Sequence, residues 1–244
     1  MKRHLGSAFK AAAWAYLVLL HLGLAYFFLS PEGRARVYWR FPPSNHETPL
    51  WRETVAAHAR LDATLSPGSA VFIGDSGVQS LNVGAVAPHS VNYGIGSDTI
   101  AGVRHRLPRY RSLPAARAIV LLIGSNDLAM RPVEAVAADY AGLVASLPAA
   151  PRLVLVAVLP IDERSVAAGR RSNQAITELN RTIEGICAKR PSCDMVDAGP
   201  MLRDAAGQLR QDLHIGDGLH LNAAGYRILI AGLAAALDRP RAGR

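Results

Sequence analysis

Short apolar runs alternate with helical stretches along most of this chain, and that alternation most narrows the folds open to it. Each run has the length of a strand that is buried on both faces. The runs predicted to be strands are residues 70–73, 91–93, 118–123, 153–159 and 195–197. The predicted helices are residues 51–65, 98–112, 132–147, 166–190 and 222–237. This alternation predicts an α/β domain with a five-stranded parallel sheet and helices on both faces.

The length and composition fit one such domain with an added segment. The chain has 244 residues, enough for one α/β domain plus an appendage and short for two domains. Hydrophobic residues make up 50% of the chain and charged residues 19%, so a buried core can form. A disordered chain is therefore excluded.

The N-terminal segment has the pattern of a membrane helix. Residues 11–30 contain no Asp, Glu, Lys or Arg, and Lys2, Arg3 and Lys10 precede them. About 20 helical residues span roughly 30 Å, the thickness of the hydrocarbon core of a bilayer. The apolar run ends in bulky residues without a small-x-small cleavage site. We interpret residues 1–30 as an uncleaved signal anchor that forms a transmembrane helix; a long cleaved signal peptide is the alternative.

The location of the main domain is inferred from two further features. Basic residues flank the apolar run on both sides, so the positive-inside rule does not fix its orientation. A basic stretch before an apolar run is, however, the usual export signal. Cys187 and Cys193 lie six positions apart, where a short disulfide loop could close, although both could also be thiols in the core. We expect a single-pass membrane protein whose domain lies outside the cytoplasm, in the periplasm or at the cell surface.

The remaining segments complete the predicted organisation. Residues 31–50 contain Pro42 and Pro43 and show no periodicity, which is typical of a tether. Residues 51–238 hold the predicted strands and helices, and residues 239–244 form a basic tail.

The charge of the chain raises the question of anionic partners. The formal net charge is +8, which suits nucleic acid, anionic lipid or an anionic polymer. Most arginines are scattered, and the one cluster comprises Arg104, Arg106, Arg109 and Arg111, with Tyr110 as its sole aromatic residue. We interpret this cluster as a solvated helix face and expect no nucleic-acid binding.

A serine follows the first predicted strand. In parallel sheets of this kind, functional residues gather in the loops at the carboxyl ends of the strands. Ser76 is reached through Gly74 and Asp75, and the glycine permits a sharp turn that would expose the serine hydroxyl. The alternative is an ordinary turn in which Ser76 caps the next helix.

Two more strand ends carry hydrogen-bond donors. The second predicted strand ends at Gly94, with Gly96 nearby, and glycines let a backbone N–H approach a ligand closely. Asn126 follows the third strand and carries a side-chain amide. Both groups suit an oxyanion, while helix caps and turns are the ordinary alternatives. The spacing matches neither the dinucleotide fingerprint nor a P-loop.

A histidine and an aspartate stand close together near the C-terminus. Asp217 lies three residues before His220, so its carboxylate can hold the imidazole in one tautomer while the other ring nitrogen faces a nucleophile. Helix capping with a surface histidine is the alternative. A metal site that adds His214 is disfavoured, because no further His or Cys cluster lies nearby.

Together these segments resemble the four sequence blocks of the SGNH (GDSL-like) hydrolase superfamily. The blocks match, in order, at residues 74–76, Gly94, residues 124–127 and residues 217–220. Residues 92–107 and 217–226 are similar to the platelet-activating-factor acetylhydrolase-like branch, and the resemblance covers about residues 71–237. Gly77 departs from the pattern, because many relatives carry a bulkier residue after the serine.

The resemblance implies a three-layer α/β/α fold of the flavodoxin-like type and acyl-transfer chemistry. It implies that Ser76 is the nucleophile, His220 the base and Asp217 the residue that orients His220. It also implies an oxyanion hole made by the backbone N–H groups of Ser76 and Gly94 and by the Asn126 amide. It implies neither a metal nor an organic cofactor.

The function expected from this resemblance is ester hydrolysis. The substrate would be a carboxylic ester of a lipid or of an envelope glycan, acetyl esters included. One alternative is an O-acyltransferase of envelope polysaccharide that uses the same triad. Another is a non-catalytic SGNH-like assembly module of the envelope. The sequence does not fix the natural substrate, the acyl chain length or the oligomeric state.

Overall fold

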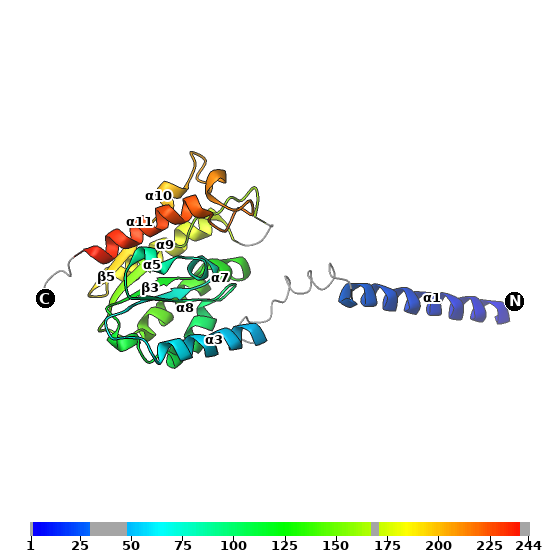
Figure 1. Ribbon diagram of the computed structural model, residues 1–244. Helices are drawn as coiled ribbons and strands as arrows, with labels where there is room; N and C mark the ends of the chain where they lie inside the picture. The colour runs from blue at the N-terminus through cyan, green and yellow to red at the C-terminus, as the bar shows by residue number, and fades with distance from the viewer. Residues whose placement is uncertain (1, 30–47, 167–170, 240–244) are drawn as a thin grey trace. The chain divides into compact units, whose positions relative to one another are not determined.

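The computed structural model describes residues 2–29, 48–166 and 171–239 (Figure 1). The chain divides into two compact units, Met1–Ser44 and Asn45–Arg244. The N-terminal unit contains helix α1 (Lys2–Leu29). The tether predicted over residues 31–50 lies outside the described residues as far as residue 47, and the predicted tail does so from residue 240.

The predicted membrane span is not supported. A span needs about 20 consecutive apolar residues in one helix. Within the part of the chain that the structure describes, no helix is both long and apolar enough to cross a bilayer.

The second unit is built around a parallel sheet, as predicted. Its strands are β1 (Ala70–Gly74), β2 (Ser90–Gly94), β3 (Ala118–Leu122), β4 (Arg152–Val156) and β5 (Cys193–Val196). They are ordered β2-β1-β3-β4-β5, and every neighbouring pair is parallel. Gly74 pairs with Gly94 on one side and with Leu122 on the other. The carboxyl ends of β1, β2 and β3 therefore meet at one edge.

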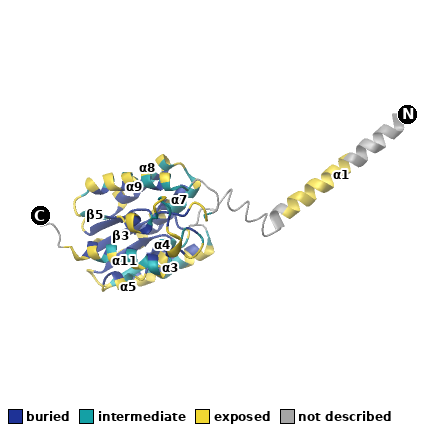
Figure 2. Cartoon of the chain, turned by 90° about the horizontal axis from the view of Figure 1, so that it is seen from above, coloured by how far each residue is buried: buried dark blue, intermediate teal, exposed yellow. Residues whose placement is uncertain are grey.

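Helices cover both faces of this sheet (Figures 1 and 2). The longer ones are α3 (Pro49–Asp62), α6 (Ile100–Arg106), α8 (Val133–Ser146), α9 (Asn173–Ala188) and α11 (Ala223–Asp238). Shorter α-helices are α4 (Ser76–Gln79), α5 (Val83–Val86), α7 (Ser125–Met130) and α10 (Gly199–Leu202). Turns of 3-10 helix are η2 (Leu107–Arg109), η3 (Leu113–Ala115) and η4 (Gln211–Leu213).

The alternation of side chains along each strand produces two separate cores. Val71 and Ile73 belong to a cluster that includes residues of α6, α8 and α9. Ala70 and Phe72 point the other way, into a cluster with residues of α5, α10 and α11. Fully burying one large apolar side chain stabilises a fold by about 1.5–3 kcal/mol. Both faces of each strand are thus filled, which explains the continuous apolar runs in the sequence.

Several predicted elements are shorter in the structure, and two of them end early for identifiable reasons. The helix predicted over residues 98–112 ends as α6 at Arg106 and continues as 3-10 turns that contain Pro108 and Pro114. The strand predicted over residues 153–159 ends at Val156, because the Asn180 side chain bonds both the N–H and the carbonyl of Val158.

The sequence predicted that the arginine cluster is a solvated helix face. The structure shows that one of its four arginines is buried. Arg104, Arg109 and Arg111 are exposed, but Arg106 is completely buried. Its guanidinium forms an ion pair with the buried carboxylate of Asp98, with 2.9 Å between Nε and Oδ2. A buried arginine is stable when its donors are satisfied in this way.

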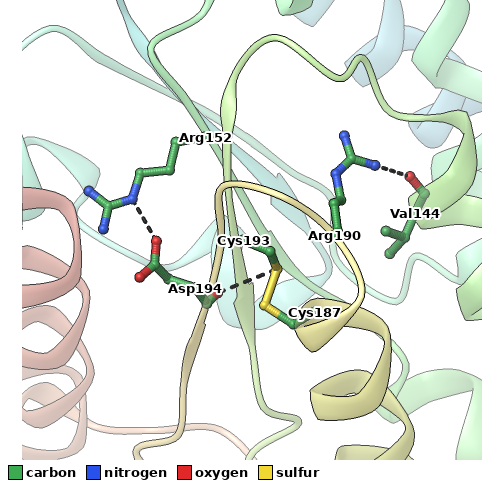
Figure 3. The surroundings of a disulfide bond; sticks show 6 residues. All are labelled: Val144, Arg152, Cys187, Arg190, Cys193 and Asp194. Atoms are coloured by element: carbon green, nitrogen blue, oxygen red, sulfur yellow. Dashed lines mark hydrogen bonds and ion pairs between the residues drawn. A yellow bond between two sulfur atoms is a disulfide. The ribbon is translucent and has the colours of Figure 1, made fainter. Parts of the chain in front are cut away.

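The two cysteines form a disulfide, which settles the question that the sequence left open. The bond joins Cys187, near the end of α9, to Cys193, the first residue of β5 (Figure 3). In the same region Arg190 donates to the carbonyl of Val144, and Arg152 pairs with Asp194. The bond therefore links the C-terminal end of α9 to the edge strand β5 and closes the turn between them.

Candidate active site

Ser76 lies directly beyond the carboxyl end of β1, as predicted. Gly74 ends the strand, and a Cβ at this position would meet the Leu122 carbonyl oxygen of β3 at 2.0 Å. Asp75 then caps α4, because its Oδ1 accepts the Gly77 N–H at 2.9 Å. Ser76 is the first residue of α4, so its backbone N–H has no partner within that helix.

His220 and Asp217 approach Ser76 from a point 144 residues further along the chain. The Ser76 Oγ lies 3.1 Å from His220 Nε2, and His220 Nδ1 lies 2.5 Å from Asp217 Oδ2. The other oxygen of Asp217 accepts the backbone N–H groups of Leu219 and His220, at 2.9 Å each. The structure therefore brings together the three residues that the sequence singled out for nucleophilic chemistry, in the order serine, histidine, aspartate.

Hydrogen bonds keep Asp217 ionised. Burial by itself raises the pKa of Asp217, but the bonds from the His220 side chain and from the two backbone N–H groups bring it below its ordinary value. An ionised carboxylate at this position favours the tautomer of His220 that has its proton on Nδ1. The unprotonated Nε2 then faces the Ser76 hydroxyl.

His214 braces the turn that carries Asp217 and His220. Its Nδ1 accepts the backbone N–H groups of Gly216 at 3.0 Å and Gly218 at 3.1 Å. Both glycines have positive φ, 106° and 71°, a conformation that L side chains rarely adopt. The sequence disfavours His214 as the ligand of a metal. Among the described residues, no group of three or more His, Cys, Asp or Glu could hold a metal ion.

A pocket opens beside the serine. Ser76, His220, Ser125 and Asn126 contribute polar groups to its wall, and Leu122, Leu159 and Leu219 contribute apolar ones. Asn126 donates through Nδ2 to the Asp98 carbonyl at 3.0 Å, which uses one of its two amide hydrogens. The second amide hydrogen remains for another acceptor.

The N–H of Gly94, an expected oxyanion donor, forms a hydrogen bond within the protein. Its N–H donates to Asn92 Oδ1 at 2.8 Å, and Gly94 is absent from the described residues that line the pocket. Asn92 also donates through Nδ2 to the carbonyls of Val78 and Leu81. Asn92 therefore ties the end of β2 to α4 and to the residues after it. The sequence does not reveal this role, because an asparagine inside a short strand carries no signal for that contact.

Gly94→Ala should destabilise the protein, because the glycine touches the backbone of α4. A Cβ at position 94 would lie 2.1 Å from the backbone nitrogen of Gln79. Neither strand β2 nor α4 can move without disturbing the sheet, so we expect a loss of roughly 1–3 kcal/mol or more in the free energy of unfolding. Chemical denaturation measures it. Gly185→Ala is the control: nothing lies within 4 Å of its Cβ position, so it should be neutral or stabilising. Equal effects of the two substitutions would contradict the prediction.

Asp75 is a buried carboxyl next to the serine. Burial raises its pKa to about 6; the Gly77 N–H and Arg171 lower it, and Asp98 and Asp127 raise it further. The carboxyl titrates near pH 4 in an unfolded chain. Between about pH 4 and pH 6 the folded protein therefore holds a proton that the unfolded chain has released. The contribution of Asp75 to stability is greatest below this window and is lost as the pH rises through it.

Asp75→Asn should abolish the loss of stability between about pH 4 and pH 6. The asparagine amide stays neutral, and its oxygen can still accept the Gly77 N–H. The melting temperature of the variant, relative to the unsubstituted protein, should be higher at pH 7 than at pH 4. Thermal unfolding at both pH values measures the difference. Asp238→Asn, at an exposed position, is the control. If the relative melting temperature of Asp75→Asn is the same at both pH values, the buried carboxyl does not titrate in this window.

Arg106 connects the strand ends that carry the site. It donates to the carbonyl of Gly74 at 3.1 Å and to that of Tyr93 at 2.7 Å, the groups just before Asp75 and Gly94. Its partner Asp98 also accepts the Trp51 indole N–H at 3.1 Å, which ties α3 to the same network. Sequence reasoning missed this role, because nothing distinguishes Arg106 from the exposed arginines around it.

Comparison with known proteins identifies the fold and the family. The sequence model of the GDSL-like lipase/acylhydrolase family matches residues 72–228, which is more than half of the chain. A search of curated proteins finds no match. Among solved structures, a Streptococcus pneumonia protein provisionally assigned as a platelet activating factor is 26% identical. The similarity covers 77% of this chain and 92% of the other, with a TM-score of 0.70.

Two further structures share the fold at lower identity. A GDSL-like lipase from Bacteroides thetaiotaomicron is 20% identical over 75% of this chain and 97% of its own, with a TM-score of 0.62. An acetylxylan esterase from Geobacillus stearothermophilus is 18% identical over 71% of this chain and 97% of its own, with a TM-score of 0.54. The chain belongs to the GDSL-like lipase/acylhydrolase family and is a hydrolase that acts on ester bonds.

Proposed function

We propose that this protein is a serine esterase that hydrolyses carboxylic esters of lipids or of envelope glycans through an acyl-enzyme. The observation that carries the proposal is the chain of contacts from Ser76 through His220 to Asp217, 3.1 Å and then 2.5 Å long, beside a pocket. Such a chain activates a hydroxyl that is otherwise a poor nucleophile at neutral pH.

In the proposed mechanism, His220 Nε2 removes the proton from Ser76 as its Oγ attacks the ester carbonyl. The carbonyl π electrons move to oxygen, and a tetrahedral oxyanion forms. His220 then gives its proton to the departing alcohol, which leaves the acyl group on Ser76. A water molecule attacks this ester in the same way, with His220 again as base, and releases the acid. Asp217 stabilises the imidazolium in both halves.

The oxyanion would be held by donors at the strand ends. The Ser76 N–H and the second amide hydrogen of Asn126 supply two of them, and the Gly94 N–H is the proposed third. The Gly94 N–H is bonded to Asn92 in this structure, so it would have to be shared with the oxyanion. Removal of one donor of this kind slows acyl transfer by about 10²–10³-fold.

The substrate class is proposed from the pocket and from the relatives. Leucine side chains line the pocket beside the polar groups, which suits an acyl chain next to a polar ester. The similar solved structures include a lipase and an acetylxylan esterase, one named for lipid esters and the other for acetylated glycan. Both classes therefore belong in the test.

The test measures hydrolysis and labelling by the full-length chain. Aryl esters of graded acyl length and acetylated oligosaccharides are offered as substrates, and a serine-directed phosphonate is the label. We expect turnover of at least one ester series and labelling at Ser76, identified by mass spectrometry. A folded protein that neither turns over any ester nor takes the label would contradict the proposal. Formation of an acylated sugar when an acceptor is added would instead favour the O-acyltransferase.

We also propose that the domain works outside the cytoplasm as part of a single-pass membrane protein. The Cys187–Cys193 disulfide supports the first part, since such bonds persist in oxidising compartments. The basic and then apolar order of the N-terminal segment motivates the second, which stays a prediction from the sequence. A reporter that fluoresces in the cytoplasm alone, fused after Arg244, should remain dark. A bright fusion would place the domain inside the cell.

A further inference from the structure

Arg171 reaches the candidate oxyanion donor from a distant part of the chain. It precedes α9 by two positions and is half-buried. Its Nε donates to the Ser125 carbonyl at 2.8 Å, and Nη2 donates to Asn126 Oδ1 at 3.3 Å. One guanidinium thus binds the first two residues of α7, the helix that follows β3. The proposed mechanism assigns no role to Arg171.

The contact with Asn126 bears on which way the amide points. The oxygen and nitrogen of an asparagine amide are nearly the same size, so the hydrogen bonds around it decide its orientation. The Asp98 carbonyl requires the NH2 group on one side, and the Arg171 guanidinium requires the oxygen on the other. A flipped amide would place Oδ1 against the Asp98 carbonyl and NH2 against a cation. The two contacts therefore select one orientation.

That orientation matters because charge develops on the substrate carbonyl oxygen during acyl transfer. An amide that presents its NH2 group stabilises this charge, and one that presents its oxygen repels it. Donors that are already aligned need no reorganisation when the charge appears. A residue that fixes the amide should therefore affect the transition state more than the binding of the neutral ester.

We propose that Arg171 is a positioning residue that fixes the Asn126 amide with its NH2 group available to the oxyanion. This inference rests on the proposed esterase function and deepens it. Arg171 acts through Asn126 and touches no reacting atom. Its guanidinium also lies close enough to Asp75 for the two charges to interact, which helps to keep the arginine in place.

The experiment compares Arg171→Met, Arg171→Lys, Asn126→Ala and the double variant Arg171→Met/Asn126→Ala in the full-length protein. Steady-state hydrolysis of a short aryl ester gives kcat and KM separately. Arg171→Met should lower kcat by about tenfold and leave KM within about twofold. This loss is smaller than the roughly 10²–10³-fold loss expected when an oxyanion donor is removed entirely. Arg171→Lys should show a similar loss, because an ammonium lacks the fork that holds the Ser125 carbonyl and the Asn126 amide together. Arg181→Met, an exposed arginine on α9, is the control and should match the unsubstituted protein.

The double variant separates positioning from general structural support. Once Asn126 is alanine, removal of Arg171 should lower kcat by less than twofold further, because the group it positions is gone. A further tenfold loss in that background would overturn the proposal, as would a kcat for Arg171→Met equal to that of the unsubstituted protein. Melting temperatures are recorded for every variant. The side-chain amide resonances of Asn126, assigned by their absence in Asn126→Ala, should broaden or shift in Arg171→Met, and unchanged resonances would also overturn it.

The outcomes also separate this inference from the proposed function. If the unsubstituted protein hydrolyses the ester and Ser76 takes the phosphonate, while Arg171→Met behaves like the unsubstituted protein, the inference fails alone. If the unsubstituted protein neither hydrolyses the ester nor takes the label, both fail together.

Discussion

Ser76→Ala should lower kcat/KM for ester hydrolysis by about 10⁴–10⁶-fold, because it removes the atom that would attack the carbonyl. His220→Ala should lower kcat/KM by a similar factor, because it removes the base whose Nε2 lies 3.1 Å from the Ser76 Oγ. Asp217→Asn should lose about 10⁴-fold, since an amide favours the wrong imidazole tautomer. The three side chains act as a unit. Combining Ser76→Ala with His220→Ala should therefore add little to either single loss.

The loss should be one of chemistry and not of folding. The side chains of His220 and Asp217 are 38% and 40% exposed, so their replacement leaves no unpaired group in the core. Substitutions at such positions usually change stability by no more than about 0.5 kcal/mol. Ser146→Ala, an exposed serine of α8, is the matched control and should keep full activity. If Ser76→Ala retains more than a few per cent of the activity while Ser146→Ala retains all of it, another nucleophile carries the reaction.

Arg106→Met should have the largest effect on stability, about 3–5 kcal/mol. The substitution leaves the Asp98 carboxylate completely buried without its counter-charge. It also removes the donors that hold the Gly74 and Tyr93 carbonyls at the ends of β1 and β2. Activity should fall as well, because those strand ends position Ser76. Chemical denaturation and ester hydrolysis measure the two effects.

The pH dependence and a double variant identify the cause of that loss. Burial already raises the pKa of Asp98, and loss of Arg106 should raise it further. The folded variant then holds a proton that the unfolded chain has released, so its stability should fall as the pH rises above about 4. Arg106→Met/Asp98→Asn should regain part of the stability, because an amide needs no counter-charge. Arg109→Met, at an exposed position, should change little. A double variant no more stable than Arg106→Met would show that the lost carbonyl contacts, and not the unpaired charge, cause the damage.

Much of the fold could be predicted from local pattern. The five strands and their parallel arrangement followed from apolar runs that alternate with helices, because strands covered on both faces need a continuous apolar sequence. The helix that contains Tyr140 was placed to within one residue at each end. The helix predicted from residue 166 begins instead at Asn173, where the Ser172 side chain caps it. A cap of that kind is a local choice that apolar periodicity does not show.

The candidate site could be predicted in part. Ser76, Asp217 and His220 could be named because four short blocks, in order, resemble those of the SGNH hydrolase superfamily. Each block alone left helix caps and turns as alternatives. The membrane span over residues 1–30 stays a prediction from composition. Among the described residues, no helix is long and apolar enough to cross a bilayer.

The sequence by itself determined the fold class, the family and the residues that face one another at the site, because these depend on periodicity and short motifs. The tertiary structure alone decided the surroundings of those residues. It buried Arg106 among three exposed arginines, gave the Gly94 N–H to Asn92, and placed Arg171 on Asn126, 45 positions away. Such contacts join groups that are distant in the chain, and their geometry is fixed by the packing of helices on the sheet. No local pattern records where a long side chain will find its partner.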